Sequence, residues 1–288
     1  MRSTWFAGKH ALKQMRWQVR RLKASLQYSP GTLHRLPVVF GNAMPKSGSH
    51  LLTQILSGLT LIGPFVDPGF PPVNRSEDNQ PLPSEKVIRN LLRMRPGDIR
   101  YGYIHAIEPY VSILTGLQRA TIFLSRDPRD MIVSHVFYAT DLHAGHGMHS
   151  YYNQELDSME ARIDAAIRGV TRPGYELSSV RQRYDSYRGW LDQPGVLCLK
   201  FEDLILAREA ALNQLLDYLE AKGFQSRLSR QAAVDRLAAA IAPLKSGTFR
   251  KGVPGNWQEH FTPANLETFH QVAGNLLDEW GYGGDANG

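Results

Sequence analysis

Three short polar segments of the sequence contain the residue types that bind phosphate groups. The first covers residues 45–50, where Lys46, two serines and Gly48 precede an apolar run. Glycine lets a turn aim backbone N–H groups at an anion, while a lysine and hydroxyls add charge and further donors. The lysine precedes the glycine here, so the G-x-x-x-x-G-K-S/T order of a Walker A loop is absent. The segment predicts a phosphate-binding turn, with an ordinary surface turn as the alternative.

The second segment begins at Arg126, directly after an apolar run. Pro128 suits the first turn of a helix, and Ser134 follows further along that helix. A guanidinium can hold a phosphate through two parallel hydrogen bonds. The alternatives are a salt bridge between Arg126 and a neighbouring aspartate, and a serine that faces solvent or bonds back to its own helix.

The third segment, residues 249–257, combines Arg250 and Lys251 with glycines, a proline and Trp257. Glycine makes such a loop flexible enough to close over an anion, and the two cations would then bind it. A solvated basic loop is the alternative.

The composition limits the class of protein. A chain of 288 residues with 42% hydrophobic residues suits one large domain. The single cysteine, Cys198, excludes an intrachain disulfide and a cysteine-based metal site, and indicates a reducing compartment or a protein indifferent to redox state. No apolar run reaches the ~20 residues of a membrane span, and the N-terminus lacks the apolar core of a signal peptide. We therefore expect a soluble, cytoplasmic protein.

The formal net charge of +6 is concentrated in the first 25 residues, which contain no acidic residue. Over 9–26, apolar residues recur at helical spacing and basic residues lie largely off that stripe. The apolar positions are Leu12, Met15, Val19, Leu22 and Leu26. We expect an N-terminal arm over 1–30 that forms a basic amphipathic helix with its stripe packed on the domain. The alternatives for this arm are contact with a membrane surface or an anionic partner, a transit peptide, and a nucleic-acid-binding arm. Because the remaining chain is near neutral, we expect no nucleic-acid partner.

The elements that must position the three segments alternate between strands and helices. Apolar runs predict strands at 36–41, 100–104, 120–124 and 196–200. Periodic stretches predict helices at 51–61, 109–117, 130–138 and 176–191, two more between 203 and 241, and one at 264–279. Residues 63–84 read as a surface loop and 140–155 as a mobile lid. We expect an α/β fold in a single domain over 31–284, with a mainly parallel central sheet flanked by helices and ligands at the carboxyl ends of its strands.

Taken together, the three segments resemble the signatures of the PAPS-dependent sulfotransferases. Residues 45–51 are similar to the family's P-loop-like 5′-phosphosulfate loop, P-K-S/T-G-S/T-x-W/L. Residues 126–134 are similar to its 3′-phosphate site, R-N/D-P-K/R-D with a later serine, and 250–257 to its third signature, R-K-G-x-x-G-D/N-W. Phe201 to Leu204 and Trp280 to Tyr282 resemble two weaker marks, the first of which has an aromatic residue beside the adenine.

The resemblance implies an enzyme that transfers the sulfuryl group of PAPS to a hydroxyl or amine acceptor and releases PAP, with no metal. It implies His105 as general base, because the family's catalytic histidine follows a short strand ahead of the 3′-phosphate arginine. It also implies that Lys46 and Ser134 belong to the catalytic centre. The donor-binding residues that it implies are Lys46, Ser47, Gly48, Ser49, His50, Arg126, Ser134, Phe201, Arg250, Lys251 and Gly252.

Three departures from the family signatures leave the adenine contacts and the oligomeric state open. Tyr103 stands where many members have a lysine, and Leu51 replaces an adenine-stacking tryptophan. The family's dimer motif is also incomplete. An ATP-dependent P-loop kinase and a catalytically inactive PAP-binding or scaffold protein are the competing functions.

The acceptor is not predicted. Its pocket is expected to form from 63–84, 140–155 and parts of 240–248, and a small molecule, a glycan, a lipid or a carrier-bound group would each suit a mixture of polar and aromatic residues. A metal site formed by His143, His146 and His149 is a minor alternative, because their spacing lacks a carboxylate at the usual place.

Overall fold

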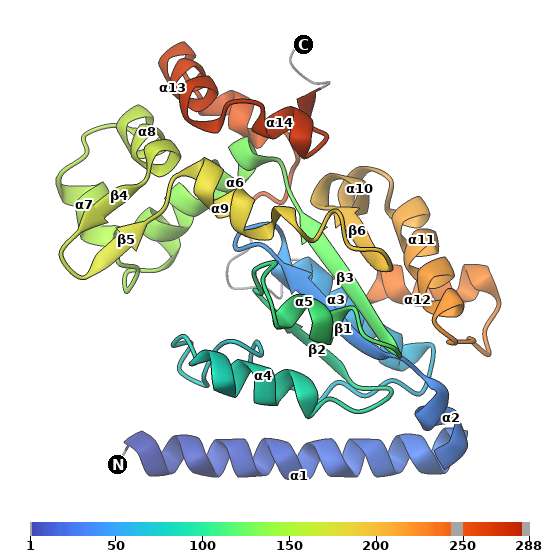
Figure 1. Ribbon diagram of the computed structural model, residues 1–288. Helices are drawn as coiled ribbons and strands as arrows, with labels where there is room; N and C mark the ends of the chain where they lie inside the picture. The colour runs from blue at the N-terminus through green and yellow to red at the C-terminus, as the bar shows by residue number, and fades with distance from the viewer. Residues whose placement is uncertain (1, 243–249, 284–288) are drawn as a thin grey trace.

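The computed structural model describes residues 2–242 and 250–283 (Figure 1). Phe249, part of the expected acceptor segment 240–248 and the predicted domain end at 284 lie outside the described residues.

A parallel four-stranded sheet forms the centre of the protein, in the strand order β2-β1-β3-β6 (Figure 1). The strands are β1 (Val38–Ala43), β2 (Ile99–Gly102), β3 (Arg119–Ser125) and β6 (Val196–Lys200). Phe40 of β1 lies opposite Arg100 of β2 and Thr121 of β3. Strand β1 is buried throughout, as is typical of a parallel sheet covered on both faces. The predicted fold class is confirmed, and β6 has the predicted bounds.

Two hydrophobic layers cover the two faces of the sheet. Phe40 and Phe123 point into one layer, while Val39 and Ile122 point into the other, because successive side chains of a strand alternate between faces. The phenylalanine side packs against α4 (Ser84–Leu92), α5 (Tyr110–Leu114), α6 (Pro128–Phe137), α8 (Met159–Arg168), α9 (Val180–Arg188), α13 (Pro263–Ala273) and α14 (Leu276–Glu279). The other side packs against α3 (Ser49–Gly58), α10 (Phe201–Leu206), α11 (Arg208–Ala221) and α12 (Arg230–Ala240).

The connections depart from the prediction in several places. Helices α4 and α8 were not predicted, and the segment 203–241 holds three helices rather than two. The hairpin of β4 (Val170–Arg172) and β5 (Tyr175–Leu177) was also missed. Residues 140–155 are not irregular throughout, because a π-helical turn (Tyr138–Leu142) and α7 (His149–Gln154) occupy much of this segment. Met148 and Tyr152 are fully buried, so this part of the segment is anchored in the core.

The N-terminal helix α1 (Arg2–Tyr28) lies along the edge of the domain, beneath α4 in Figure 1. The expectation that its apolar stripe packs on the domain is wrong, because the five stripe residues are 47 to 79% exposed. Trp17 on another face of the helix is buried against Leu33, Val66 and Phe70. Its indole Nε1 donates to Asp98 Oδ1 over 2.9 Å. The large indole with a polar partner therefore decides which face packs.

Three further short elements lie within the described residues. Helix α2 (Pro30–Arg35) joins α1 to the sheet, and 3-10 helices cover Leu59–Leu61 and Asn256–Glu259. In the described residues, no helix combines the length and the apolar character that crossing a bilayer requires.

Candidate active site

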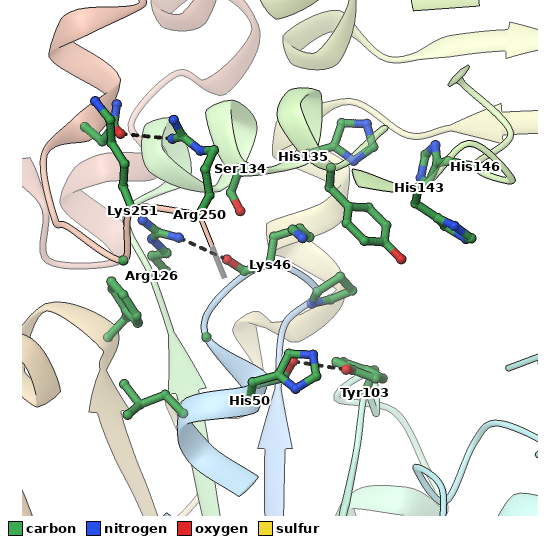
Figure 2. A pocket seen from close by; sticks show the side chains of 18 of the residues that line it. Lys46, His50, Tyr103, Arg126, Ser134, His135, His143, His146, Arg250 and Lys251 are labelled. Atoms are coloured by element: carbon green, nitrogen blue, oxygen red, sulfur yellow. Dashed lines mark hydrogen bonds between the residues drawn. The ribbon is translucent and has the colours of Figure 1, made fainter. Parts of the chain in front are cut away.

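A cavity of about 750 Å³ lies at the carboxyl edge of the sheet (Figure 2). The loops that follow all four strands contribute to it: Lys46 after β1, Tyr103 after β2, Arg126 after β3 and Phe201 after β6. Most of the residues implied by the resemblance line this one cavity. They are Lys46, Gly48, Ser49, His50, Arg126, Ser134, Phe201, Arg250, Lys251 and Gly252.

Ser47 holds the loop after β1 in shape but does not line the cavity. The Ser47 hydroxyl donates to the carbonyl oxygens of Met44 over 2.7 Å and Leu124 over 3.1 Å, and its residue is fully buried. Gly48 has φ +95°, and a Cβ atom there would lie 2.6 Å from Phe201 Cδ2. The loop therefore requires glycine at this position for two reasons, and Ser47 holds the loop against β3.

One end of the cavity is cationic. Figure 2 shows Arg126, Ser134, Arg250 and Lys251 grouped on one side of Lys46. The Arg126 guanidinium lies 4.3 Å over the Phe201 ring and donates to the Lys46 carbonyl oxygen over 3.4 Å, yet its buried Nε has no hydrogen-bond partner. Its nearest counter-charge, Asp130, is 3.5 Å away. This end of the cavity therefore contains N–H donors that are available to bind an anion.

Asp130 connects the second and third segments. Its carboxylate oxygens accept hydrogen bonds from the backbone N–H groups of Gly255 over 2.9 Å and Trp257 over 2.8 Å. Arg129 stacks on the Trp257 ring at 4.0 Å and pairs with Asp127 over 2.6 Å. The turn at the start of α6 therefore positions the loop that contains Arg250 and Lys251.

Residues 201–204 and 280–282, the two weaker family signatures, position the end of β3. Glu202 accepts hydrogen bonds from the Asp127 backbone N–H over 3.0 Å and from the Tyr282 hydroxyl over 3.1 Å. The Tyr184 hydroxyl donates to the Arg126 carbonyl oxygen over 2.6 Å. Residues from three distant segments thus fix the backbone from which the Arg126 side chain projects.

The electrostatics of the cavity favour an anionic ligand. Burial, and secondly the positive charge of Arg126, lower the pKa of Lys46 to about 8. Burial and the charge of Lys46 lower the pKa of His50. Both shifts arise because cationic groups are gathered in a partly desolvated space without matching anions.

The other end of the cavity is aromatic and is lined by Tyr138, His143, His146 and Tyr175, which we call the histidine–tyrosine end. The Tyr138 ring lies 5.3 Å from the His143 ring and 5.7 Å from the His146 ring, and Lys46 Nζ lies 3.8 Å over it. Burial is the main cause that lowers the pKa of His146 to about 4. This imidazole is therefore neutral at pH 7 and acts as a polar aromatic surface.

The sequence predicted that residues 140–155 contribute to the acceptor pocket, but it did not indicate Tyr103, Tyr138 and Tyr175 as lining residues. The position of Tyr138, one helical turn after Ser134, could have indicated that both face one side. Tyr175 begins β5 and carries no local signal of this kind. Among the described residues, no three or more His, Cys, Asp or Glu side chains are arranged to hold a metal ion.

His105 is not brought into the cavity lining. Its ring packs edge-on against Tyr187, with centroids 4.9 Å apart. Tyr103, two residues earlier, lines the cavity instead, and its hydroxyl donates to Ser49 Oγ over 3.1 Å. The cavity contains a different imidazole close to Lys46, that of His50 (Figure 2).

Comparison with known proteins agrees with this arrangement. The family model of the sulfotransferase domain matches residues 117–281, more than half of the chain. Sulfotransferase 2B1 of Rattus norvegicus is 22% identical over 252 residues, covering 81% of this chain and 69% of that protein. Sulfotransferase 2A6 of Mus musculus is 22% identical over 245 residues, covering 79% of this chain and 80% of that protein. The chain therefore belongs to the sulfotransferase family.

Solved structures share the fold. Mouse sulfotransferase SULT7A1, complexed with PAP, superposes with a TM-score of 0.58 at 17% identity, covering 91% of this chain and 95% of that chain. Retinol dehydratase, in complex with androsterone and PAP, gives a TM-score of 0.53 at 14% identity, covering 85% of this chain and 83% of that chain. At these identities the likeness establishes the common architecture.

Proposed function

We propose that this chain transfers the sulfuryl group of PAPS to a hydroxyl or amine of an acceptor and releases PAP. The observation that carries this proposal is the gathering of Lys46, Arg126, Arg250 and Lys251 around one cavity at the carboxyl edge of the sheet. PAPS has two anionic groups, a 3′-phosphate and a 5′-phosphosulfate, and needs cations at two places. Family membership supports the same reaction.

The two anionic groups of the donor would occupy different parts of the cavity. The 5′-phosphosulfate would rest on the loop 45–50 at the N-terminus of α3, where backbone N–H groups and Lys46 meet it. The 3′-phosphate would be held by Arg126, Ser134, Arg250 and Lys251. Phe201 and Leu51, which both line the cavity, would flank the adenine.

The transfer requires a base and a group that stabilises the leaving PAP. The acceptor oxygen would attack sulfur in line while the bond between sulfur and the bridging phosphate oxygen breaks, and Lys46 would stabilise the charge that develops there. His105 is the base that the resemblance implies. His50 competes for the role, because it lines the cavity and because burial and Lys46 lower its pKa, which keeps its imidazole neutral and able to accept a proton.

The acceptor would bind at the histidine–tyrosine end, near Arg75, Asn79 and Gln80. A small-molecule hydroxyl compound is the proposed class, supported by the androsterone in the retinol dehydratase structure. Glycan, lipid and carrier-bound acceptors remain predictions of the sequence. A reducing, cytoplasmic location belongs to the same proposal and rests on the single cysteine.

Calorimetry with PAP in the presence of a chelator tests the donor site. We expect PAP to bind without Mg²⁺ and ATP to bind more weakly, whereas the opposite order would favour the kinase. Transfer of label from PAPS to a panel of hydroxyl acceptors tests the reaction. PAP binding with no transfer to any acceptor would favour the inactive scaffold.

Single substitutions separate the two candidate bases. The replacement that removes the base, His105→Ala or His50→Ala, should lower kcat by about 10²–10⁴-fold. His105→Ala should leave PAP affinity within a few-fold, because His105 does not line the cavity. His34→Ala, on the exposed part of α2, is the matched control. Unchanged kcat in His105→Ala would dismiss His105 as the base.

A further inference from the structure

The face of α1 that points away from the domain carries a continuous apolar stripe. It consists of Leu12, Met15, Val19, Leu22 and Leu26, all exposed. The opposite face is held firmly: Trp17 and Arg21 both donate to Asp98, and Lys13 pairs with Glu77 over 2.5 Å. The stripe is therefore displayed on a fixed helix rather than on a free tail.

Cationic side chains of α1 flank the stripe along one edge, and further cations lie on the neighbouring helix α4. At about 100° per helical residue, Arg16 and Lys23 project beside one edge of the stripe, and both are exposed. Gln18 borders the other edge and lines a second cavity, of about 700 Å³, between α1 and α4. The wall of that cavity on α4 contains Lys86, Arg89 and Arg93.

Of the three acidic residues that line the second cavity, two are paired with cations of α1. No acidic residue precedes Asp67 in the sequence. In the second cavity, Glu77 pairs with Lys13, Asp98 with Arg21, and Asp78 accepts a hydrogen bond from Ser76. The surface around the stripe thus combines exposed apolar side chains with cations whose charge faces solvent.

We propose that α1 docks this protein on an anionic lipid surface, with the stripe inserted at the level of the headgroups. An apolar stripe beside a row of cations is the pattern of helices that lie in a membrane interface, and anionic headgroups would neutralise Arg16 and Lys23. A second copy of the chain fits less well. Two stripes packed together would bring these cations close to the same cations of the other copy, with no carboxylate on this face of the helix to offset them.

The docking helix and the active-site cavity share a structural segment. The Arg20 guanidinium donates to the Asp67 carbonyl oxygen over 2.5 Å, and Glu77 holds Lys13. A few residues away, Asn79 and Gln80 line the cavity. A protein docked through α1 would therefore hold this wall of the cavity close to the lipid surface. The docking itself does not depend on the proposed reaction.

Sedimentation of the full chain with lipid vesicles tests the proposal. We expect the protein to pellet with vesicles of phosphatidylcholine and phosphatidylglycerol, much less with phosphatidylcholine alone, and less at high salt. The double variant Met15→Glu/Leu22→Glu should reduce the bound fraction by about tenfold or more. Leu117→Glu, at a leucine that is 99% exposed elsewhere on the surface, should bind like the wild type. Thermal melts followed by circular dichroism would show that both variants are folded.

Three results would overturn the proposal. The first is wild-type protein that stays in the supernatant with anionic vesicles, and the second is equal binding to both kinds of vesicle with no effect of Arg16→Gln/Lys23→Gln. The third is a dimer, seen by light scattering without lipid, that Met15→Glu/Leu22→Glu dissociates. That last result would make a second copy the occupant of the stripe.

Discussion

Asp130 at the start of α6 accepts a hydrogen bond from the backbone N–H of Trp257 over 2.8 Å, across 127 residues of sequence. The same carboxylate accepts a second hydrogen bond from Gly255 and lies beside the Arg126 guanidinium. One buried acidic group thus aligns two of the segments proposed to hold the 3′-phosphate. Its role is to position these cations rather than to contact the ligand.

Replacing Asp130 by asparagine should loosen the third segment. The amide can accept one of the two backbone hydrogen bonds and has lost the charge that faces Arg126, so we expect PAP affinity to fall about tenfold. Faster hydrogen exchange at the Gly255 and Trp257 amides would identify the cause. Asp235→Asn, at an exposed position of α12, is the control. An affinity equal to that of the wild type would contradict the positioning role.

PAP binding should depend on pH through Lys46, whose pKa in the empty cavity is lowered to about 8. A bound anion stabilises the charged lysine and raises its pKa, so no proton is exchanged well below pH 8. Above that value a proton must be taken up, and the association constant should fall by up to about tenfold per pH unit. Calorimetry in buffers of different ionisation enthalpy measures this uptake.

Two variants give that pH experiment its controls. Lys46→Met should bind PAP more weakly and take up fewer protons above pH 8. Lys251→Met, which removes an equal charge, should also bind PAP more weakly but keep the wild-type proton uptake. Uptake that survives in Lys46→Met would show that another group is responsible.

Gly48→Ala and Gly174→Ala separate backbone strain from crowding at the site. Both glycines have positive φ, +95° and +78°, so alanine is strained by about 1–2 kcal/mol at either position. A Cβ atom at Gly174 meets nothing within 4 Å, whereas one at Gly48 lies 2.6 Å from the Phe201 ring. We expect Gly174→Ala to lower only the melting temperature. Gly48→Ala should in addition weaken PAP binding about tenfold or more, as measured by calorimetry.

Asp98→Asn should weaken the attachment of α1. The buried Asp98 carboxylate accepts hydrogen bonds from Trp17, Arg21 and the backbone N–H of Arg95. Loss of the buried charge beside Arg21 should cost about 3 kcal/mol of unfolding free energy, or detach α1 locally. Urea unfolding and limited proteolysis within α1 distinguish these outcomes. Asp185→Asn removes a partner of Arg181 from a more exposed ion pair and should change stability by less than about 1 kcal/mol.

Much of the cavity lining proposed to hold the donor was predictable because its residues occupy short contiguous segments. A turn such as 45–50 brings its own lysine, glycine and hydroxyls together, whatever the rest of the fold does. Parallel strands end at one edge of their sheet, so Lys46, Arg126 and Phe201 had to meet there. Local patterns also predicted β6 with its observed bounds, since a short apolar run between polar segments suits a strand.

The direction of individual side chains was not predictable in the same way. Asn42 of β1 binds both the backbone N–H and the carbonyl oxygen of Ile104, over 2.8 and 2.9 Å. These contacts fix the chain just after β2, where Tyr103 lines the cavity and His105 packs against Tyr187. They join residues that are distant in sequence, so a motif alone could not select Tyr103 over His105.

Helix α1 shows the same division between local and tertiary information. The spacing of its apolar residues determined that 9–26 forms an amphipathic helix with basic side chains. Periodicity describes the faces of a helix but not which face meets the protein. Only the tertiary structure decided this, because Asp98 and Phe70 offer Trp17 a polar partner and an apolar surface together. That choice leaves the apolar stripe of α1 exposed.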